Sequence, residues 1–542
     1  MSLVATGAPP TRPAPRHQAA DGARSRRVAR PNVLLALSLV VVGALALPLV
    51  FLFAEAAGAG WSGVWQLIWR SLTLQLLWNT VRLTVVVTVL CAIVGTLAAY
   101  GVERTTLPGR HIWAVLVVVP IAIPDFVIAF GWNSLFTWVE GFRGAVLVMT
   151  VAVYPLVYLP VAASLRGADP GQEEVARSLS ASRLRVFWRI TVGQARRAIL
   201  GGSLLVALVV LAEYGAFEIL AFRTFTTEIF SEFTTGFDTS SACALSIVLV
   251  LLSFVVLFGE NASRGGGRIA PVGRATHQVL TRRRLGKATL PVLLAYTALV
   301  GAALGVPVAA SIYWVFEGGS HAFSGVPLVT AAAYTATYSA AAGALATLAA
   351  IPVALLVVRY PSRWSMLLER STFVVLATPG LVVALALVYF SEHDARGFAY
   401  QTAPLLVFAY ALLFFPLALV GVKTSVLQVP VGLEEVASSL GVRRAGVFFR
   451  VTFRLIAPGL GAAFCLVFLS CVTELTATLI LIPTGAETLA TQFWAYQQNL
   501  SYGQAAPFAL TIIALAAIPS YLLGRFFDRL PARAQRSPVP GT

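Results

Sequence analysis

Two polar segments of this sequence carry the side chains best suited to contact another molecule. Each contains two adjacent glutamates, then an alanine, then a residue that breaks a helix, and the second segment repeats the first 261 positions later. We interpret each as a short amphipathic helix whose polar end can seat in a groove of a soluble partner; the alternative is an ordinary basic loop beside a membrane. The residues are Glu173, Glu174, Ala176 and Ser180 in the first copy, and Glu434, Glu435, Ala437 and Gly441 in the second.

A second pair of acids, Glu213 and Glu474, lies inside long apolar stretches at equivalent positions of the same repeat. A charged group near the centre of a membrane helix costs about 2.5–3.5 kcal/mol, so it normally faces a bundle interior or an aqueous path. With the phenol groups of Tyr154, Tyr158 and Tyr214, these carboxylates could line a translocation path, and the two glutamates could bind a hard cation transiently. The alternative is that both glutamates are protonated, hydrogen-bonded structural residues.

Membrane helices must position these residues, because the chain is 58% hydrophobic and only 11% charged, whereas soluble domains are about 25% charged. A bilayer core of about 30 Å needs about 20 apolar residues per helix. The sequence therefore predicts an all-α membrane protein with twelve transmembrane helices in two groups of six. The spans are expected at 33–54, 79–101, 112–132, 142–165, 198–221, 241–259, 289–314, 331–358, 371–391, 402–425, 459–482 and 506–524.

The net charge of +16 does not indicate nucleic-acid binding, because the arginines lie in short clusters between apolar runs and form no basic stripe with interleaved aromatics. Basic loops alternate with acidic ones, and the positive-inside rule then predicts that both termini are cytoplasmic. We expect a basic tail at 1–32, a first repeat at 33–259, a cytoplasmic linker at 260–288, a second repeat at 289–525 and a tail at 526–542.

The two groups of six spans are copies of one another. The shift of 261 residues needs no gap from Pro155 to Leu220, and its matches include Glu, Arg, Pro and Ser in a hydrophilic loop, where chance apolar similarity does not produce them. Because each half has an even number of predicted spans, the copies should enter the membrane with the same orientation, as parallel repeats. Outside the glutamates, the shift superposes Arg183, Phe187, Arg189 and Thr191 on Arg444, Phe448, Arg450 and Thr452.

The two polar segments, at about 166–196 and 427–457, resemble the EAA loop of the permease subunits of ATP-binding-cassette (ABC) importers. That loop has the pattern Glu-x-Ala, with a glycine four residues after the alanine and Ile-x-Leu-Pro ten residues beyond that glycine. The matches are Glu174, Ala176 and Ile190 in the first copy, and Glu435, Ala437 and Gly441 in the second, while Gly193 and Arg454 replace the final proline. Ser180 replaces the glycine in the first copy, and Val175 and Val436 replace the middle alanine.

The resemblance implies the type I importer permease fold in a bacterial inner membrane. It also implies that the two loops contact two copies of a separate ATPase, and that an extracytoplasmic binding protein delivers the cargo. The chain has no GxxxxGK[ST] phosphate loop. We therefore expect a transport subunit rather than an enzyme, with no cofactor of its own and with ATP and Mg²⁺ on the partner.

The fused twelve-span form is similar to the ferric-iron permease family, and it is also related to the thiamine permeases. The segments that follow Ala212 and Thr473 resemble the corresponding segments of iron permeases, and this resemblance favours ferric iron as cargo. Thiamine, phosphonate or a polyamine is the alternative cargo for the same machinery. A secondary transporter is the alternative from a different class, because such proteins also combine repeats with intramembrane acids.

Overall fold

The structure is a computed structural model, and it describes residues 32–58, 65, 69–167, 176, 178, 180, 182–263, 282–323, 327–393 and 400–534. Within these residues the chain is helical, and the one β-type pairing is an isolated bridge between Thr105 and Arg283. The prediction of an all-α fold is confirmed. Residues 1–31 of the predicted first tail, the middle of the predicted linker (264–281) and residues 535–542 of the predicted last tail lie outside the described residues, whereas 526–534 continue the last helix of the chain.

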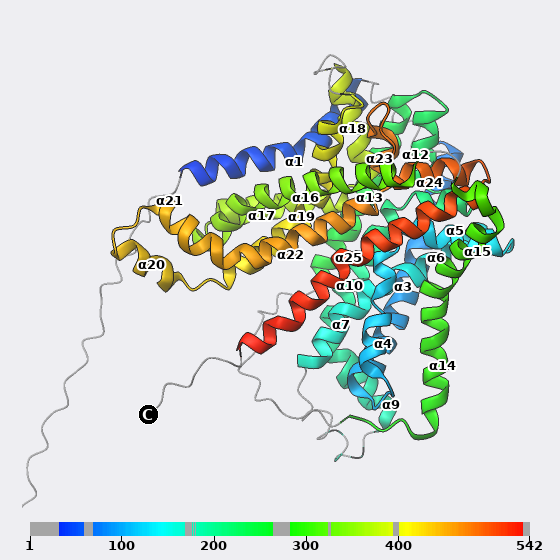
Figure 1. The fold of residues 1–542 in the computed structure, drawn as a ribbon, viewed down its shortest axis with the longest axis horizontal. Helices are drawn as coiled ribbons and strands as arrows, with labels where there is room; N and C mark the ends of the chain where they lie inside the picture. The colour runs from blue at the N-terminus through cyan, green and yellow to red at the C-terminus, as the bar shows by residue number, and fades with distance from the viewer. Residues whose placement is uncertain are drawn as a thin grey trace, which may run out of the picture.

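The first half forms a bundle in which long helices alternate with short ones (Figure 1). Its elements are α1 (Asn32–Gly58), α3 (Ser71–Arg104), α4 (Arg110–Leu116), η1 (Val119–Ala122), α5 (Asp125–Leu135), α6 (Gly141–Val153), α7 (Pro155–Gly167), α9 (Arg183–Val186), η2 (Phe187–Thr191), α10 (Val192–Ala212), α11 (Gly215–Ile219), α12 (Phe225–Thr234) and α13 (Thr239–Ser263).

The second half repeats this order, with its long helices inclined to those of the first half in Figure 1. Its elements are η3 (Gly286–Ala288), α14 (Thr289–Val300), η4 (Gly301–Gly305), α15 (Val306–Gly318), η5 (Gly319–Phe323), α16 (Leu328–Arg359), α17 (Arg363–Phe373), η6 (Val374–Ala377), α18 (Gly380–His393), α19 (Ala403–Leu427), α20 (Val431–Ser439), α21 (Arg444–Val447), η7 (Phe448–Thr452), α22 (Phe453–Val472), α23 (Thr476–Leu481), α24 (Leu489–Gln498) and α25 (Tyr502–Ala534).

The described residues contain ten helices that are long and apolar enough to cross a membrane, or eleven if one bent pair counts as a single span. The predicted count of twelve is therefore not confirmed. The two predicted spans that fail are the third of each half. The span expected at 112–132 is bent by 93° between Ala122 and Asp125, and the span expected at 371–391 is divided into η6 and the shorter apolar helix α18.

Prolines explain both divisions. Pro124 precedes α5 and Pro379 precedes α18, and the carbonyl of each accepts the first two hydrogen bonds of the helix that follows it. A proline donates no hydrogen bond and disfavours the helical conformation of the residue before it, so a helix cannot continue through these positions without strain. The two halves thus share a broken third span at the same structural position.

The first helices of the two halves are exchanged. α1 packs on α16 and α18 of the second half, where Phe51 and Phe390 lie with ring centroids 5.1 Å apart. In the first span of the second half, the segment α15 packs on α5 of the first half as well as on α25 of its own half. A β-carbon added at Gly131 in α5 would lie 2.5 Å from the α-carbon of Pro307, so this crossing requires glycine. The first span of each half therefore packs on the other half.

The duplication is also visible in tertiary hydrogen bonds. The backbone N–H of Phe225 donates to the Thr80 hydroxyl over 3.2 Å, and in the second half the N–H of Leu489 donates to the Thr335 hydroxyl over 2.8 Å. Both bonds fix the first residue of equivalent short helices, α12 and α24, to a long helix. Each of these helices begins with a threonine capping box, which satisfies N–H groups that the helix leaves unpaired.

Candidate functional site

The short helix α20 contains the second predicted glutamate pair and ends in a defined turn. Gly441 adopts a left-handed conformation with φ of +83°. The N–H of Val442 donates to the carbonyl of Ala437 over 3.2 Å, and the N–H of Gly441 donates to that of Ser438 over 3.0 Å. This pair of bonds is the Schellman motif, which satisfies the last carbonyls of a helix and favours glycine at the left-handed residue.

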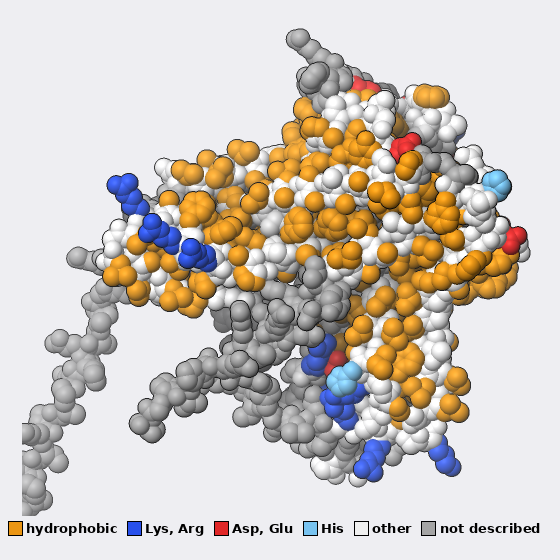
Figure 2. Space-filling view, viewed as in Figure 1, with side chains coloured by type: hydrophobic (Ala, Val, Ile, Leu, Met, Phe, Trp, Pro, Cys, Tyr) orange, Lys and Arg blue, Asp and Glu red, His pale blue; other side chains and the backbone are white. Residues whose placement is uncertain are grey.

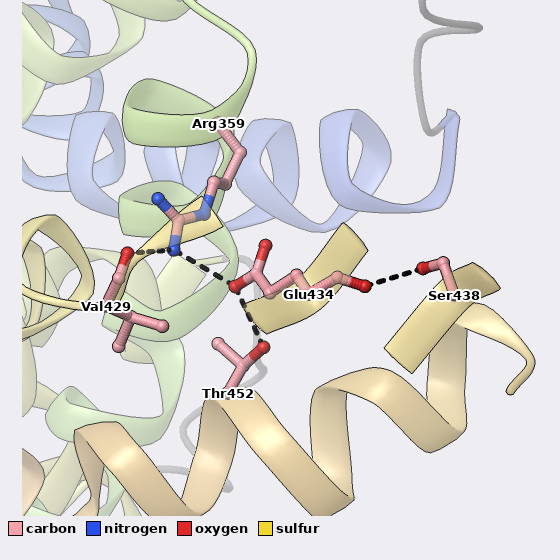
Figure 3. Close-up of polar contacts among 5 residues, drawn as sticks. All are labelled: Arg359, Val429, Glu434, Ser438 and Thr452. Atoms are coloured by element: carbon pink, nitrogen blue, oxygen red, sulfur yellow. Dashed lines mark hydrogen bonds and ion pairs between the residues drawn. The ribbon is translucent and has the colours of Figure 1, made fainter. Parts of the chain in front are cut away.

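Glu434 points from α20 toward the membrane helices (Figure 3). Its Oε1 accepts hydrogen bonds from Arg359 Nη2 and from Thr452 Oγ1, each over 3.0 Å, and the Arg359 Nη2 also donates to the carbonyl of Val429 over 3.0 Å. The Arg359 and Glu434 side chains are 14% and 20% exposed, so the ion pair is shielded from water on most sides. Glu434 therefore attaches α20 to α16 and η7.

Glu435, the next residue, is exposed and has no such attachment among the described residues. The same short helix and its ends expose an unusual amount of apolar surface. Large apolar side chains exposed to water on a polar segment indicate a surface that another protein covers. These side chains are Val431, Leu433, Val436 and Leu440, which are 49%, 47%, 58% and 78% exposed.

In the first copy, Glu173 and Glu174 lie outside the described residues. Ala176 is helical and half-buried, and Ser180 is exposed with φ of +59°, so the serine holds the same left-handed conformation as Gly441. After this turn each copy has a five-residue π-helix, η2 or η7, at positions related by the shift of 261. Thr452, the last residue of η7, is the one that binds Glu434.

Glu213 and Glu474 do not lie inside continuous spans, which corrects the expected spans 198–221 and 459–482. Glu213 lies in the break between α10 and α11, and Glu474 in the break between α22 and α23. Glu213 Oε1 accepts the N–H of Ala216 over 2.7 Å, and Glu474 Oε1 accepts the N–H of Ala477 over 2.9 Å. Each carboxylate thus caps the short helix after it and neutralises part of the positive helix end.

A third acid, Asp125, was not among the predicted site residues. It is the first residue of α5 and lies close enough to Glu213 to interact with it electrostatically, as does Glu474. Gly215 shows how tightly these elements converge. A β-carbon there would lie 3.1 Å from that of Phe126, which follows Asp125, and 2.7 Å from Cδ2 of Leu475, which follows Glu474. An aspartate after a proline within an apolar run was the sequence signal for this position.

The three predicted tyrosines separate into two groups. Tyr154 is fully buried and donates its hydroxyl hydrogen bond to the carbonyl of Val117, and Tyr158 lies near the Glu103–Arg166 ion pair at the far end of the half. This placement favours packing roles for both rather than the predicted path. Tyr214 does lie next to Glu213 in the chain, and its ring contacts those of Phe230 and Trp494 in tilted arrangements, with centroid distances of 4.4 and 5.5 Å.

No group of three or more His, Cys, Asp or Glu side chains within the described part of the chain is arranged to hold a metal ion. Sequence reasoning also missed Arg359 and Thr452, the partners of Glu434. Arg359 is the last residue of α16, 75 positions before Glu434, and only the fold brings the two side chains together.

Comparison with known proteins identifies the class of this duplicated helical membrane protein. The sequence profile of the family described as "Binding-protein-dependent transport system inner membrane component" matches the chain twice, over residues 92–262 and 342–536. The chain belongs to this family. It is a multi-pass membrane permease of an ABC importer, a transport subunit in which two copies of the family unit are fused.

The relatives include a protein of similar length, a longer one and others of about half the length of this chain. The chain is 35% identical to the Fe(3+)-transport system permease protein FbpB 2 of Haemophilus influenzae, over 92% of this chain and 99% of that protein. It is 21% identical to the ferric transport system permease protein FbpB of Actinobacillus pleuropneumoniae, over 81% of this chain and 69% of that protein. The sulfate permease CysT of Salmonella typhimurium is 28% identical and covers 45% of this chain with 97% of its own length.

Proposed function

We propose that this permease imports ferric iron, delivered by an external substrate-binding protein and driven by a separate ATPase. The observation that carries the proposal is the similarity to the Haemophilus influenzae Fe(3+) permease, which extends over nearly the full length of both chains. The half-length sulfate permease, by contrast, matches less than half of this chain. Full-length similarity supports a shared cargo better than similarity of one repeat, which reports the shared machinery.

The exposed side of α20 is the proposed contact for one ATPase copy, and the equivalent segment of the first half is the contact for a second copy. Glu435 and the exposed apolar side chains of α20 would bind the ATPase, while Glu434 and Arg359 transmit its movement to α16. A helix that transmits movement from the ATPase to the permease needs a rigid attachment to the membrane helices and an exposed surface for the ATPase. This assignment divides the predicted glutamate pair into two roles.

The proposed orientation places α20 and both termini in the cytoplasm. Figure 2 supports this orientation, because Lys and Arg side chains gather near α20 and α21 and at the lower end of the view, and a broad apolar surface covers much of the molecule away from these two ends. Asp and Glu side chains lie mainly at the opposite ends in the same view. An excess of basic residues marks the cytoplasmic side of membrane proteins.

Glu213 and Glu474 are proposed to lie on the path of the cation, where they bind it transiently. Each side chain accepts a backbone hydrogen bond at a helix break and is still partly exposed, which a transient contact with a cation requires. Tyr214 beside Glu213 would contribute a further oxygen. Carboxylate and phenol oxygens are the ligands that a hard trivalent cation prefers.

Uptake by proteoliposomes that contain the permease, its ATPase and its binding protein tests the cargo. We expect ATP-dependent uptake of ferric iron and none of sulfate, molybdate or thiamine. Uptake of one of these instead of iron would overturn the cargo and leave the class intact. Uptake driven by an ion gradient without ATP would overturn the proposed ATPase coupling.

The coupling proposal is tested separately by Glu174→Lys combined with Glu435→Lys. Charge reversal at a seated contact costs several kcal/mol, so we expect ATPase binding and uptake to be lost while the chain stays in the membrane. The matched control is Glu392→Lys, an exposed acid at the end of α18, which should leave both unchanged. Normal uptake by the double variant would contradict the coupling role.

A further inference from the structure

Arg82 is a charged residue on the side of α3 that faces lipid. The exposed side chains of α3 recur every three or four residues and form one stripe along the helix, and Arg82 lies in the middle of it, four residues after Trp78 and three before Val85. The stripe consists of Leu74, Trp78, Val85, Val89, Ile93 and Leu97, which are 48–64% exposed. The opposite side of α3, with Leu83 and Val87, is fully buried.

The Arg82 guanidinium is held by two aromatic rings. It lies 4.3 Å from the ring centroid of Phe142 at the start of α6 and 5.8 Å from that of Phe222. A backbone bond of 2.6 Å from the N–H of Gly141 to the carbonyl of Leu220 keeps the two rings together. A cation over aromatic faces is stabilised but keeps its N–H donors in the ring plane free for an acceptor.

Arg82 lacks an acceptor among the described residues. Its Nε is buried without a hydrogen-bond partner, and none of the ion pairs between described residues includes it. The buried Nε is enclosed by the protein, whereas the two terminal nitrogens are not among the buried atoms of this half-buried side chain. An ionised side chain without an acceptor is costly, so an acceptor from outside the chain is expected at the terminal nitrogens.

The position of Arg82 along α3 indicates what supplies the acceptor. Arg104, at the other end of α3, is 22 residues away, which corresponds to about 33 Å of helix and slightly exceeds the hydrocarbon thickness of about 30 Å. Long helical side chains point toward the helix N-terminus, here toward the level of Trp78. Exposed tryptophans at this end, Trp65, Trp69, Trp78 and Trp138, mark the boundary between hydrocarbon and headgroups.

We propose that Arg82 binds the phosphate of a phospholipid headgroup, with Phe142 and Phe222 fixing the guanidinium. The lipid lies in the leaflet at the N-terminal end of α3, which is the outer leaflet in the orientation proposed above. An arginine fork matches a phosphodiester in geometry and charge. A carboxylate of a soluble partner fits less well, because Arg82 lies on the hydrocarbon side of Trp78 within the lipid-facing stripe.

Native mass spectrometry of the full chain, released from nanodiscs of phosphatidylglycerol and phosphatidylethanolamine, tests the proposal. Arg82→Gln should retain one phospholipid fewer than the wild type, with retention weakened roughly tenfold to a hundredfold, as expected for charge-assisted hydrogen bonds. The matched control is Arg143→Gln, which removes an exposed arginine next to Phe142 and should retain the same lipids as the wild type. Equal retention by wild type and Arg82→Gln would overturn the site.

A second measurement separates the lipid from a free anion and from a packing role. Added phosphatidylglycerol should raise the thermal unfolding temperature of the wild type in detergent but not that of Arg82→Gln, and Arg82→Lys should respond partially. If Arg82→Gln does not fold, the test is whether phosphatidylglycerol stabilises Arg82→Lys less than it stabilises the wild type. Equal responses in wild type and variant would overturn the proposal, and so would an equal stabilisation by inorganic phosphate. Neither measurement depends on iron or on ATP.

Discussion

Where their membrane helices break, the two halves share the same helix cap but differ in the residue beside it. In both, a glutamate accepts the N–H of the residue three positions later, at Glu213 and at Glu474. The neighbouring broken span brings Asp125 to this region in the first half, whereas in the second it brings Gly380, where a β-carbon would lie 3.1 Å from Glu474 Oε1. The duplication has thus retained the helix cap and varied the residue beside it.

The halves differ again at the turn that ends the predicted coupling helix. Gly441 and Ser180 hold the same left-handed conformation, with φ of +83° and +59°. Glycine adopts this conformation without steric cost, and other residues with a penalty of about 1 kcal/mol. The second copy therefore has the relaxed form of the turn, and the first copy has a strained one.

Gly380→Asp should have the largest effect, because it gives the second half the acid that the first half has. Its β-carbon would press on Glu474 Oε1, which the N–H of Ala477 holds in place. Overpacking of this kind costs about 1–3 kcal/mol, and repulsion between carboxylates adds to it. We expect a lower thermal unfolding temperature in detergent, with Gly380→Ala showing the packing part alone. If both variants were as stable as the wild type, the absence of a side chain at position 380 would not be needed for packing against Glu474.

Arg359→Met should detach α20 while the first half stays intact. A hydrogen bond to a charged group is worth about 1.5–3 kcal/mol, and here Glu434 would also be left in a shielded position. Uptake should fall strongly although the exposed face of α20 is unchanged, and ATP hydrolysis should lose its dependence on the binding protein. Full uptake in this variant would mean that one coupled half suffices.

The double variant Glu213→Gln and Glu474→Gln removes charge but keeps an oxygen to cap each short helix. If the carboxylates attract the cation, iron uptake should fall about tenfold, which corresponds to about 1.4 kcal/mol, with ATP hydrolysis unchanged. Iron uptake by the two single variants and by Asp125→Asn would then show how much each half contributes. Unchanged uptake in the double variant would leave both glutamates as structural caps.

Exchanging the turn residues tests the comparison at the coupling helices directly. Ser180→Gly should stabilise the first copy and Gly441→Ser should destabilise the second, each by about 1 kcal/mol, because the left-handed conformation favours glycine. Hydrogen exchange of the two segments measures the change. If the two substitutions had effects of the same sign, the turns would not be equivalent.

The smallest expected effect is at the start of the last helix of the first half. The Asp238 carboxylate accepts hydrogen bonds from the side chain and the N–H of Ser241, and these bonds lower the pKa of Asp238. A lowered pKa adds stability above the unfolded value of about 3.9 and loses it as the pH falls through the folded value. Because Asp238 is exposed, only a few tenths of a kcal/mol are expected. Wild type should exceed Asp238→Asn in unfolding temperature at pH 7, and this difference should shrink as the pH falls below the unfolded value.

Much of this protein could be predicted from residue order alone. The apolar runs gave the all-α membrane fold and most of its spans, since hydrophobicity over about 20 residues is a local property. The shift of 261 residues identified the repeat, and the family match on both halves agrees with it. The helix breaks at Ser180 and Gly441 were also predicted, because they depend on backbone conformation near each residue.

Only the tertiary structure decided which side chains act together. Glu434 and Glu435 are indistinguishable as a sequence pair, yet Arg359 and Thr452 hold the first and leave the second exposed. The exchange of α1 and α15 between halves likewise has no sequence signature, because nearly all faces of these helices are apolar. Partner choice depends on contacts between residues far apart in the chain, and in a membrane protein uniform hydrophobicity hides which face meets which neighbour.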